Sequence, residues 1–405
     1  MIPFDVPSPQ IDLEKLPPPI LTSEPGSFAQ RTFAVRIPRI IQETLELNSF
    51  PDDIRAALEE LRMEILDGRI RALREEAPDR RFWDEVSGPY LGRTWLDIPW
   101  YWGEAYMYRR ILEATRYFQP GPWHGFDPYA AIKATEWAPD AAPRAVNLVL
   151  EESPTAPRAR FERLLHASLW GNRTDLSYNV AAQVGKSRRH QDERSNLLID
   201  DTRRVWDYLK QGPCARLCII TDNAGTELAM DMALVDFVLS ENLASEVVLH
   251  LKPQPFFVSD AMPRDVEAGL EALREGGDAA RALSDRLQRY IDNQRLRLST
   301  HWLYATSLFY FQLPDDLHTE LGGMGLVILK GDVNYRRLVG DMHWPPTTPF
   351  EEATAYFPAP LLSLRTMKAE LILGLREGQA EELRKQDPAW MVNGQRGLIQ
   401  GRLSG

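Results

Sequence analysis

The feature that most constrains the fold is an alternation of strand-like and helix-like segments that begins near residue 205. Short apolar runs rich in β-branched residues occur at residues 215–221, 245–251, 325–330 and 360–366. Amphipathic helical segments follow, most clearly at residues 226–241 and 263–277. Strands and helices that alternate at these lengths are typical of a doubly wound sheet. The sequence therefore predicts the α/β class, with a Rossmann-like α/β/α sandwich and a mostly parallel sheet.

The part of the chain before residue 205 has a helical pattern. Residues 38–48, 51–76, 94–115 and 156–170 place apolar side chains at helical spacing, and the pattern of residues 196–212 also favours a helix. Residues 1–27 are rich in proline and have no such period, which indicates an extended arm on the surface. We expect this arm, an all-helical lobe at 28–205 and a Rossmann-like catalytic lobe at 206–405.

Charge and composition exclude several classes of protein. The formal net charge of −11 argues against a general nucleic-acid binder, although a pocket for an anionic ligand can still be locally basic. The N-terminus lacks a signal-peptide pattern, and no apolar run is long enough to span a membrane. Only Cys214 and Cys218 are present, which favours reduced thiols over a zinc site or a disulfide. We expect a cytoplasmic protein whose oligomeric state is open.

Oxygen-bearing side chains recur where strand-like runs end. Asp222 and Asn223 follow the run at 215–221, Asp260 closes the segment PFFVSD, and Asp332 closes LVILKGD. In open α/β sheets, ligands bind outside the carboxyl ends of the strands. Carboxylate and amide oxygens suit Mg²⁺ or Mn²⁺. The alternative for Asp222 and Asn223 is a turn that caps the next helix, because both residue types are common there.

Cationic and polar side chains accompany these acids. GDVNYRRLVGD adds Asn334 and Arg336, and Lys368 follows the run at 360–366, where a lysine can act as a point charge for a phosphoryl group. GNRTDLS, with Asn172 and Asp175, could form a wall of a cleft between the lobes. Phosphate-loop and nucleophile-elbow motifs are absent, and the glycine cluster at 321–325 precedes its strand, the wrong side for a dinucleotide loop.

Several segments, taken together and in order, resemble the damage-control phosphatases, a family formerly called domain of unknown function 89. These segments are WYWGEAYMYRRI, SLWGNRTDLS, NLLIDDT, TDNAGTEL, FFVSD, LKGDVNYRRLVGD, LRTMKAE and GQRGLIQ. They extend from about residue 85 to residue 400. Within the family, the resemblance is to the acidic-residue methyltransferase-like branch of sugar-phosphate phosphatases.

The resemblance implies a helical lobe against a Rossmann-like lobe, and hydrolysis of phosphomonoesters such as fructose 1-phosphate. It implies a divalent metal, Mn²⁺, Co²⁺, Ni²⁺ or Mg²⁺, held by Asp222, Asn223 and Asp260. Substrate-binding positions fall on Glu227, on the stretch from Asp332 through Asn334 to Arg336, and on Lys368. The implied catalytic set is Asp222, Asn223, Asp260 and Lys368, and the implied partner is a small phosphorylated molecule.

Two other functions stay open at this point. One is a carboxyl methyltransferase that uses S-adenosylmethionine, although no glycine-rich turn follows the first strand-like run. The other is a sugar-phosphate sensor without catalysis, because fold does not fix function. For a phosphatase, either a water or a carboxylate such as Asp222 could be the nucleophile.

Overall fold

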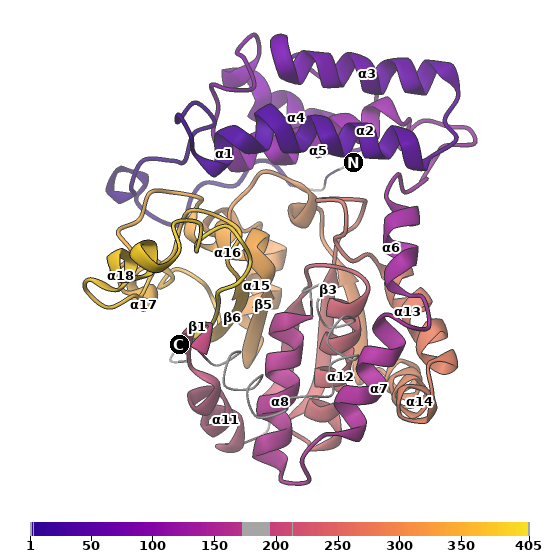
Figure 1. Ribbon diagram of the computed structural model, residues 1–405, viewed down its shortest axis with the longest axis vertical. Helices are drawn as coiled ribbons and strands as arrows, with labels where there is room; N and C mark the ends of the chain where they lie inside the picture. The colour runs from indigo at the N-terminus through magenta and orange to yellow at the C-terminus, as the bar shows by residue number, and fades with distance from the viewer. Residues whose placement is uncertain (1, 3, 172–194, 213, 404–405) are drawn as a thin grey trace.

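A computed structural model describes residues 2, 4–171, 195–212 and 214–403, and it confirms the predicted fold class. A seven-stranded sheet has the order β1-β7-β6-β5-β2-β3-β4 (Figure 1). The strands are β1 (Leu197–Asp200), β2 (Cys214–Ile220), β3 (Ala244–Leu251), β4 (Leu296–Thr300), β5 (Leu326–Lys330), β6 (Leu361–Thr366) and β7 (Gly397–Arg402). Strands β6, β5, β2, β3 and β4 pair in parallel, whereas β7 runs antiparallel to β6 and carries β1 beside it.

The strand order reverses between β2 and β5. The chain moves outward from β2 to β3 and β4, then returns to the other side of β2 for β5 and β6. Such a switch point leaves a crevice outside the carboxyl ends of the two central strands, because their following helices cover opposite faces. The segments after β2 and β5 carry Asp222 and Asp332, so the topology brings two of the predicted site residues to one place.

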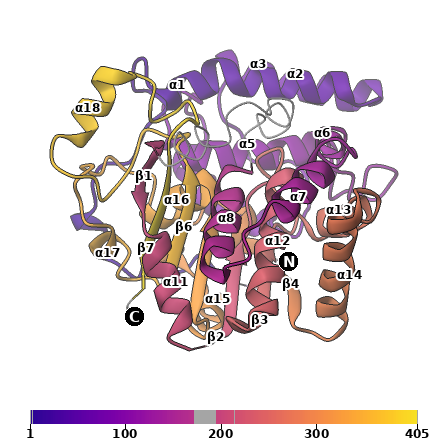
Figure 2. The same cartoon turned by 60° about the horizontal axis from the view of Figure 1, so that its bottom comes forward.

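Helices cover both faces of the sheet (Figure 2). Alternate residues of β2 enter different cores: Leu217 and Ile219 pack with one helical layer, and Cys218 and Ile220 with the other. One layer contains α7 (Ala142–Glu151), α8 (Pro157–Trp170), α12 (Thr226–Ser240), α13 (Pro263–Glu275) and α14 (Asp278–Asp292). The other face packs against α15 (Asp315–Gly322) and α16 (Gly331–Val339). Burial on both faces explains why the strands read as continuous apolar runs.

An N-terminal group of helices lies above the sheet in Figure 1. It comprises α1 (Phe28–Arg31), α2 (Ile37–Leu47), α3 (Asp52–Asp67), α4 (Arg80–Ser87) and α5 (Trp100–Ala114), and α6 (Ala130–Glu136) connects it to the lower part. Residues 100–112 of α5 are all buried, as expected for a helix that is apolar on every side. Its charged side chains are paired; the Arg109 guanidinium, for example, lies 2.6 Å from the Asp79 carboxylate.

Two details differ from the sequence predictions. Residues 197–200 form β1, because they pair with β7, and only the following α11 (Thr202–Lys210) is helical. A pairing between strands two hundred residues apart leaves no local signal, so the helical pattern there was misleading. In addition, α7, α8 and β1 all precede residue 205 but pack with the sheet. One hydrophobic core joins the N-terminal helices to one face of the sheet, and the lobe boundary near residue 205 stays a prediction.

The N-terminal arm lies along the protein and is extended for most of its length. Pro19 pairs with Met342 and Leu21 with Pro99 in isolated β-bridges, and the Ile20 amide donates to the Asp341 carbonyl at 3.0 Å. The arm therefore joins the helical group to the segment after α16. The remaining helices are α17 (Phe350–Ala353) and α18 (Gln379–Gln386). Among the described residues, none of the helices combines the length and the apolar character needed to cross a bilayer.

Candidate functional site

Backbone hydrogen bonds hold the two predicted ligand loops together. Asn223 and Asp260 form an isolated antiparallel bridge. The Ala261 amide donates to the Asp222 carbonyl at 2.7 Å, and the Ala224 amide donates to the Ser259 carbonyl at 2.7 Å. The loop after β2 and the loop before α13 therefore form one rigid unit at the carboxyl edge of the sheet. Asp222, Asn223 and Asp260 are brought together, as the strand-end positions predict.

The Asn223 amide connects the carboxylates of this unit. Its Nδ2 donates to Asp222 Oδ2 at 2.7 Å and to Glu227 Oε2 at 2.8 Å, while its Oδ1 accepts from the Ser259 hydroxyl. Glu227 lies in the first turn of α12, so the helix that follows β2 supplies the third acid of the group. The amide nitrogen thus lies between two carboxylates, each of which repels the other.

The Asp222 carboxylate lacks a cationic partner. Within the described part of the chain, no lysine, arginine or histidine nitrogen lies within ion-pair distance of it, although its side chain is buried. Burial, together with the neighbouring charges of Glu227 and Asp260, raises the pKa of Asp222 well above its usual value, and Lys252 and Lys368 only partly offset this. A buried carboxylate among other acids favours the arrival of a cation.

Lysines hold the two flanking acids in place. Lys252 Nζ lies 3.1 Å from Asp260 Oδ2 and donates to the Thr221 carbonyl at 3.2 Å. Burial nonetheless raises the pKa of Asp260, against the effect of Lys252. Lys330 Nζ lies 3.3 Å from Glu227 Oε1. Both ammonium groups are buried, so each acts as a fixed internal counter-charge.

Lys330 also anchors the site to α8. Its Nζ lies 2.9 Å from Asp231 Oδ1 and 2.9 Å from Ser168 Oγ, and the Ser168 hydroxyl donates to Asp231 at 2.6 Å. Burial raises the pKa of Asp231 to about 6, although Lys330 opposes the shift. This network crosses from β5 to α12 and α8, and it fixes the orientation of Glu227 beneath the site.

Gly331 leaves room for Asp222 at the switch point. It has φ of +82° at the start of α16, and a Cβ there would lie 2.0 Å from Asp222 Oδ2. Only glycine combines this backbone conformation with so close an approach. The first turn of α16 therefore lies directly against the carboxylate that ends the neighbouring strand.

Asp332 positions the segment that carries Lys368. Its Oδ1 accepts from Arg365 Nε at 2.7 Å and from the Lys368 amide at 3.1 Å. Lys368 is half-buried, and its positive charge acts to lower the pKa of Asp222 against the larger effect of burial. Asp332 and Lys368 therefore meet at the predicted edge, where Asp332 orders the turn and Lys368 supplies a positive charge.

Two predicted substrate-binding residues have interior partners instead. Asn334 accepts from the Tyr310 hydroxyl at 2.8 Å and donates to the Lys330 carbonyl at 2.8 Å. The Arg336 guanidinium lies 2.7 Å from Asp341 Oδ1 and 2.6 Å from Glu104 Oε2. Both side chains are buried, and these contacts tie α16 to the sheet and to the helical group. Their roles in substrate binding stay predictions, and the structure gives both a different one.

Asn172 and Asp175 of the GNRTDLS segment lie outside the described residues. Its first residue, Gly171, ends α8 beside the site, because a Cβ there would lie 2.8 Å from the Glu227 Cα. The contribution of this segment to a cleft stays a prediction.

Comparisons with known proteins identify the family of the chain. A family model described as "Damage-control phosphatase ARMT1-like domain" matches residues 32–383. The chain belongs to this family. It is 33% identical to the damage-control phosphatase ARMT1 of Danio rerio over 95% of this chain and 97% of that protein. For the proteins of the same name from Rattus norvegicus and Homo sapiens, identity is 32% and 29%, each over 93% of this chain and 96% of the relative. A solved DUF89 family protein from Pyrococcus horikoshii aligns with 14% identity and a TM-score of 0.49, over 91% of this chain and 97% of that one.

The side chains of this family member fit a divalent cation. Asp222 and Asp260 provide two carboxylates and Asn223 an amide, and the space that a Cβ on Gly331 would fill is taken up by the Asp222 carboxyl group. Among the described residues no group of three His, Cys, Asp or Glu side chains forms a metal site, and the predicted set contains only two such residues. For Asn223 to bind a cation, its amide must turn so that Oδ1 faces Asp222 and Nδ2 donates to Ser259. The exchange preserves its hydrogen bond to Ser259.

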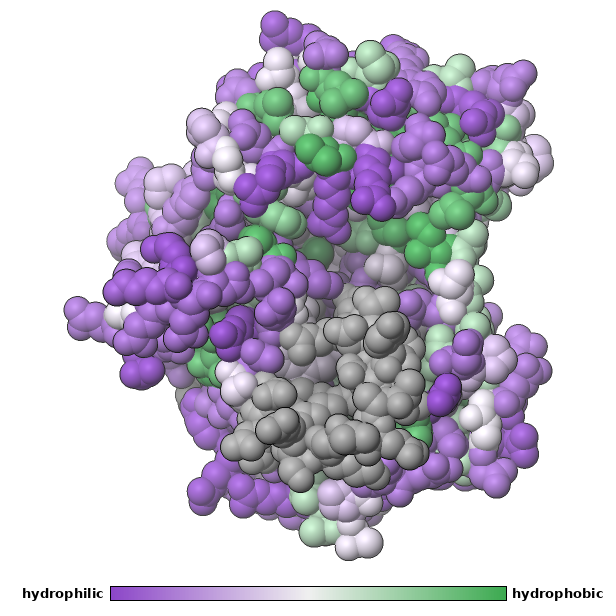
Figure 3. Space-filling view, viewed as in Figure 1, coloured by the Kyte–Doolittle hydropathy of each residue, from purple (hydrophilic) through white to green (hydrophobic). Residues whose placement is uncertain are grey.

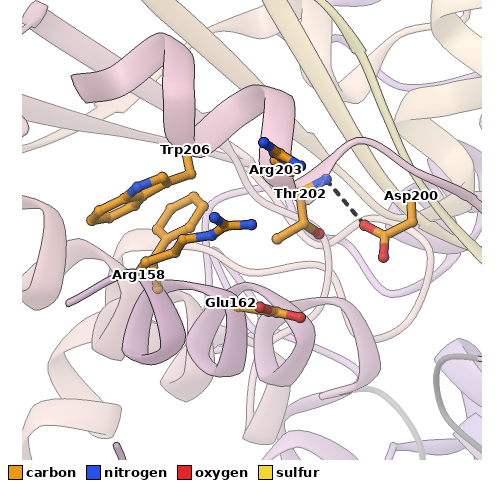
Figure 4. A pocket seen from close by; sticks show the side chains of 7 residues that line it. Arg158, Glu162, Asp200, Thr202, Arg203 and Trp206 are labelled. Atoms are coloured by element: carbon orange, nitrogen blue, oxygen red, sulfur yellow. Dashed lines mark hydrogen bonds between the residues drawn. The ribbon is translucent and has the colours of Figure 1, made fainter. Parts of the chain in front are cut away.

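A hollow lies between α8 and α11 of this damage-control phosphatase (Figure 4). It has a volume of about 280 Å³ and is lined by Arg158, Phe161, Glu162, Asp200, Thr202, Arg203 and Trp206. Strand β1 begins beside Gly397, near the carboxyl edge, and runs away from that edge to Asp200. This hollow is therefore separate from the carboxylate group, and it contains none of the predicted site residues.

Sequence reasoning missed the lysines that balance the acids. Lys252 follows β3 directly and Lys330 ends β5, so both occupy strand ends like the acids they contact. Their position at a strand end was the sequence signal that could have identified both lysines. Lysines after strands are common, however, and the partners Asp260 and Glu227 are distant in sequence. Ser259, which orients the Asn223 amide, had no signal beyond its position next to Asp260.

Proposed function

We propose that this protein is a metal-dependent phosphatase of small phosphorylated metabolites, and that sugar phosphates such as fructose 1-phosphate are among its substrates. Membership of the damage-control phosphatase family supports the reaction class. The observation that carries the proposal is the buried Asp222 carboxylate, which has no cation at ion-pair distance in the described residues, at the switch point of the sheet. Lys368 follows β6 in a neighbouring loop, and its charge acts to lower the pKa of Asp222. A divalent cation and a phosphoryl group would complete this arrangement of charges.

Asp222, Asn223 and Asp260 would hold the cation, and Mn²⁺, Co²⁺, Ni²⁺ and Mg²⁺ are the candidates. When bound, the cation supplies positive charge for the phosphoryl oxygens and lowers the pKa of a coordinated water. Lys252 orients Asp260 through their ion pair and opposes the effect of burial, which raises the pKa of that carboxylate. Ser259 fixes the Asn223 side chain from the opposite side.

Lys368 would bind the phosphoryl group itself. Phosphoryl transfer places negative charge on the equatorial oxygens, so a positioned ammonium group stabilises the transition state. Asp332 fixes the backbone position from which the Lys368 side chain extends, because it accepts hydrogen bonds from the Lys368 amide and from the Arg365 guanidinium. Either a water or Asp222 could attack phosphorus, and the two routes differ in whether a phosphorylated enzyme can be trapped.

Two alternatives make different predictions. A methyltransferase that uses S-adenosylmethionine needs a glycine-rich turn after the first central strand, and β2 is followed instead by an acid and an amide that face Glu227. A sensor would bind sugar phosphates without turnover. A group of three acids and Lys368 around one point goes beyond what a pure binding site requires, which favours the phosphatase.

The test is phosphate release from a panel of sugar phosphates with and without each metal. We expect metal-dependent release by the wild type, loss in Asp222→Asn, and wild-type activity in the matched control Asp207→Asn. Asp207 is exposed and makes only a surface contact of 3.7 Å to Arg203. Methyl transfer without phosphate release would support the methyltransferase, and binding without release would support a sensor. Equal activity in Asp222→Asn would refute the proposed ligand set.

A further inference from the structure

A cavity adjoins the ligand loops on the side of the helical group. It has a volume of about 380 Å³, within the usual range for small-molecule sites. The residues that line it are Arg36, Arg39, Ile40, Glu43, Thr44, Tyr129, Ile132, Phe257, Val258 and Ser259. They come from α2 and the segment before it, from α6 and its start, and from the loop before Asp260. Figure 3 shows hydrophobic side chains near α6, where the helical group meets the lower part.

The floor of this cavity is part of the candidate active site. Ser259 lines the cavity, and its hydroxyl donates to the Asn223 amide. Phe257 and Val258, which precede it, both have positive φ, +45° and +66°. This conformation is unfavourable for an aromatic residue and more so for a β-branched one. Strained backbone of this kind concentrates where a ligand or catalytic group has to be positioned.

Arg36 is a cation without a partner at the rim of the cavity. Across the described residues, its guanidinium makes neither an ion pair nor a side-chain hydrogen bond, and the residue is exposed. Arg39, on the same rim, is different because its Nε lies 2.7 Å from Glu43 Oε1.

A local helical irregularity sets the position of Arg36. Residues Thr32–Arg36 form a π-helical turn, in which the Ile37 amide donates to the Thr32 carbonyl. Pro38 explains the turn, because it lacks an amide hydrogen and its ring crowds the preceding carbonyls. π-Helical turns are rare and often occur at functional sites.

Tyr129 provides an independent observation. Its side chain is 1% exposed and lines the cavity, and its hydroxyl has no hydrogen-bond partner among the residues that the structure describes. Buried hydroxyl groups are normally satisfied, so this one calls for a partner that occupies the cavity. A ligand with hydroxyl or anionic oxygens would satisfy both Tyr129 and Arg36.

We propose that this cavity binds the part of the substrate that is not hydrolysed, and that Arg36 recognises a second anionic group on it. The inference rests on the proposed phosphatase function and names its substrate class: phosphomonoesters whose leaving group carries a second phosphate or a carboxylate. The apolar walls from Ile40, Ile132 and Phe257 pack against the carbon skeleton, and Tyr129 donates to one of its oxygens. Arg36 is thus a specificity-determining residue of the helical group, and the metal loops act on the other end of the substrate.

The test compares matched substrates that differ only in the second anion. Hexose 1-phosphate against hexose 1,6-bisphosphate tests a second phosphate, and glycerol 3-phosphate against 3-phosphoglycerate tests a carboxylate. For at least one pair, we expect the wild type to have the higher kcat/KM on the member that carries the second anionic group. Arg36→Gln should reduce that ratio by about tenfold or more, mainly through KM, because a charge-assisted hydrogen bond is lost. Arg297→Gln, the matched control, should change the ratio by less than about twofold, because Arg297 is exposed on β4, lies 3.1 Å from Glu246 Oε1 and does not line the cavity.

Calorimetric titration with the same compounds in metal-free buffer separates the two proposals. Monophosphate hydrolysis without preference for either compound with a second anionic group would overturn the inference and leave the phosphatase intact. If no phosphomonoester is hydrolysed but a compound with a second anionic group binds the wild type about tenfold or more tighter than Arg36→Gln, the phosphatase fails and the anion site stands. Equal binding to wild type and Arg36→Gln would overturn the inference whatever the activity. Tyr129→Phe adds a variant that removes one hydroxyl only, and we expect it to raise KM for the preferred substrate.

Discussion

Gly331→Ala tests whether the contact between the first turn of α16 and Asp222 controls the site. The new Cβ would lie 2.0 Å from Asp222 Oδ2, whereas Cβ contacts under 3.0 Å essentially never occur, so the carboxyl group has to move by about 1 Å. A misplacement of about 1 Å in a catalytic site can reduce the rate by about 10²-fold. We therefore expect kcat/KM to fall by about two orders of magnitude, with weaker binding of Mn²⁺.

The backbone cost of this substitution can be measured separately. Gly331 has φ of +82°, and a non-glycine residue there costs about 1–2 kcal/mol. Gly378 has a similar φ of +77°, and a Cβ there has no atom within 4 Å. Gly378→Ala should therefore lose about 1–2 kcal/mol of stability in urea unfolding and keep its activity. If Gly331→Ala matches Gly378→Ala in kcat/KM and in metal binding, the proposed role of Asp222 is refuted.

Three further predictions concern charges at or near the site. Lys368→Ala should lower kcat by about 10²–10³-fold in the phosphate-release assay; a loss below threefold would remove it from the transition state. Lys330→Met should reduce the free energy of unfolding by about 3–5 kcal/mol, because it leaves Asp231 and Glu227 buried without their cation. The double variant that also carries Asp231→Leu should recover part of the lost stability. If the double variant recovers none of it, the pairing of Lys330 with Asp231 is contradicted. Burial raises the pKa of Glu113, but the Arg74 amide and the guanidinium groups of Arg110 and Arg71 outweigh it, so the pKa lies below the usual 4.5. This stabilisation is complete above pH 4.5 and is lost as pH falls through the lowered pKa. The stability difference between wild type and Glu113→Gln should therefore shrink as pH falls below 4.5, and a difference that stays constant throughout acid titration would refute the assignment.

The sequence predicted the elements of this fold whose signals are local. Helix α3 has Ile54, Leu58, Leu61 and Ile65 at helical spacing, and these residues are all buried. The apolar run that forms β2 ends immediately before the Thr221-Asp222-Asn223 segment, so the end of this strand could be predicted from the sequence. Strand direction and helix periodicity depend on neighbouring residues, which is why such elements can be read from one chain.

Tertiary structure decided which charged groups meet. Arg336, in a motif that resembles a substrate-binding segment, is bound by Asp341 and by Glu104 from α5. Lys330 and Lys252, which attracted no attention in the sequence, neutralise Glu227 and Asp260. A guanidinium or ammonium group forms its ion pair with whichever carboxylate the fold brings within a few ångströms, and the energy of that pair depends on burial. Neither distance nor burial is encoded in residue order, so the sequence by itself determined the strand ends that carry the site, and only the packed structure determined the charge balance within it.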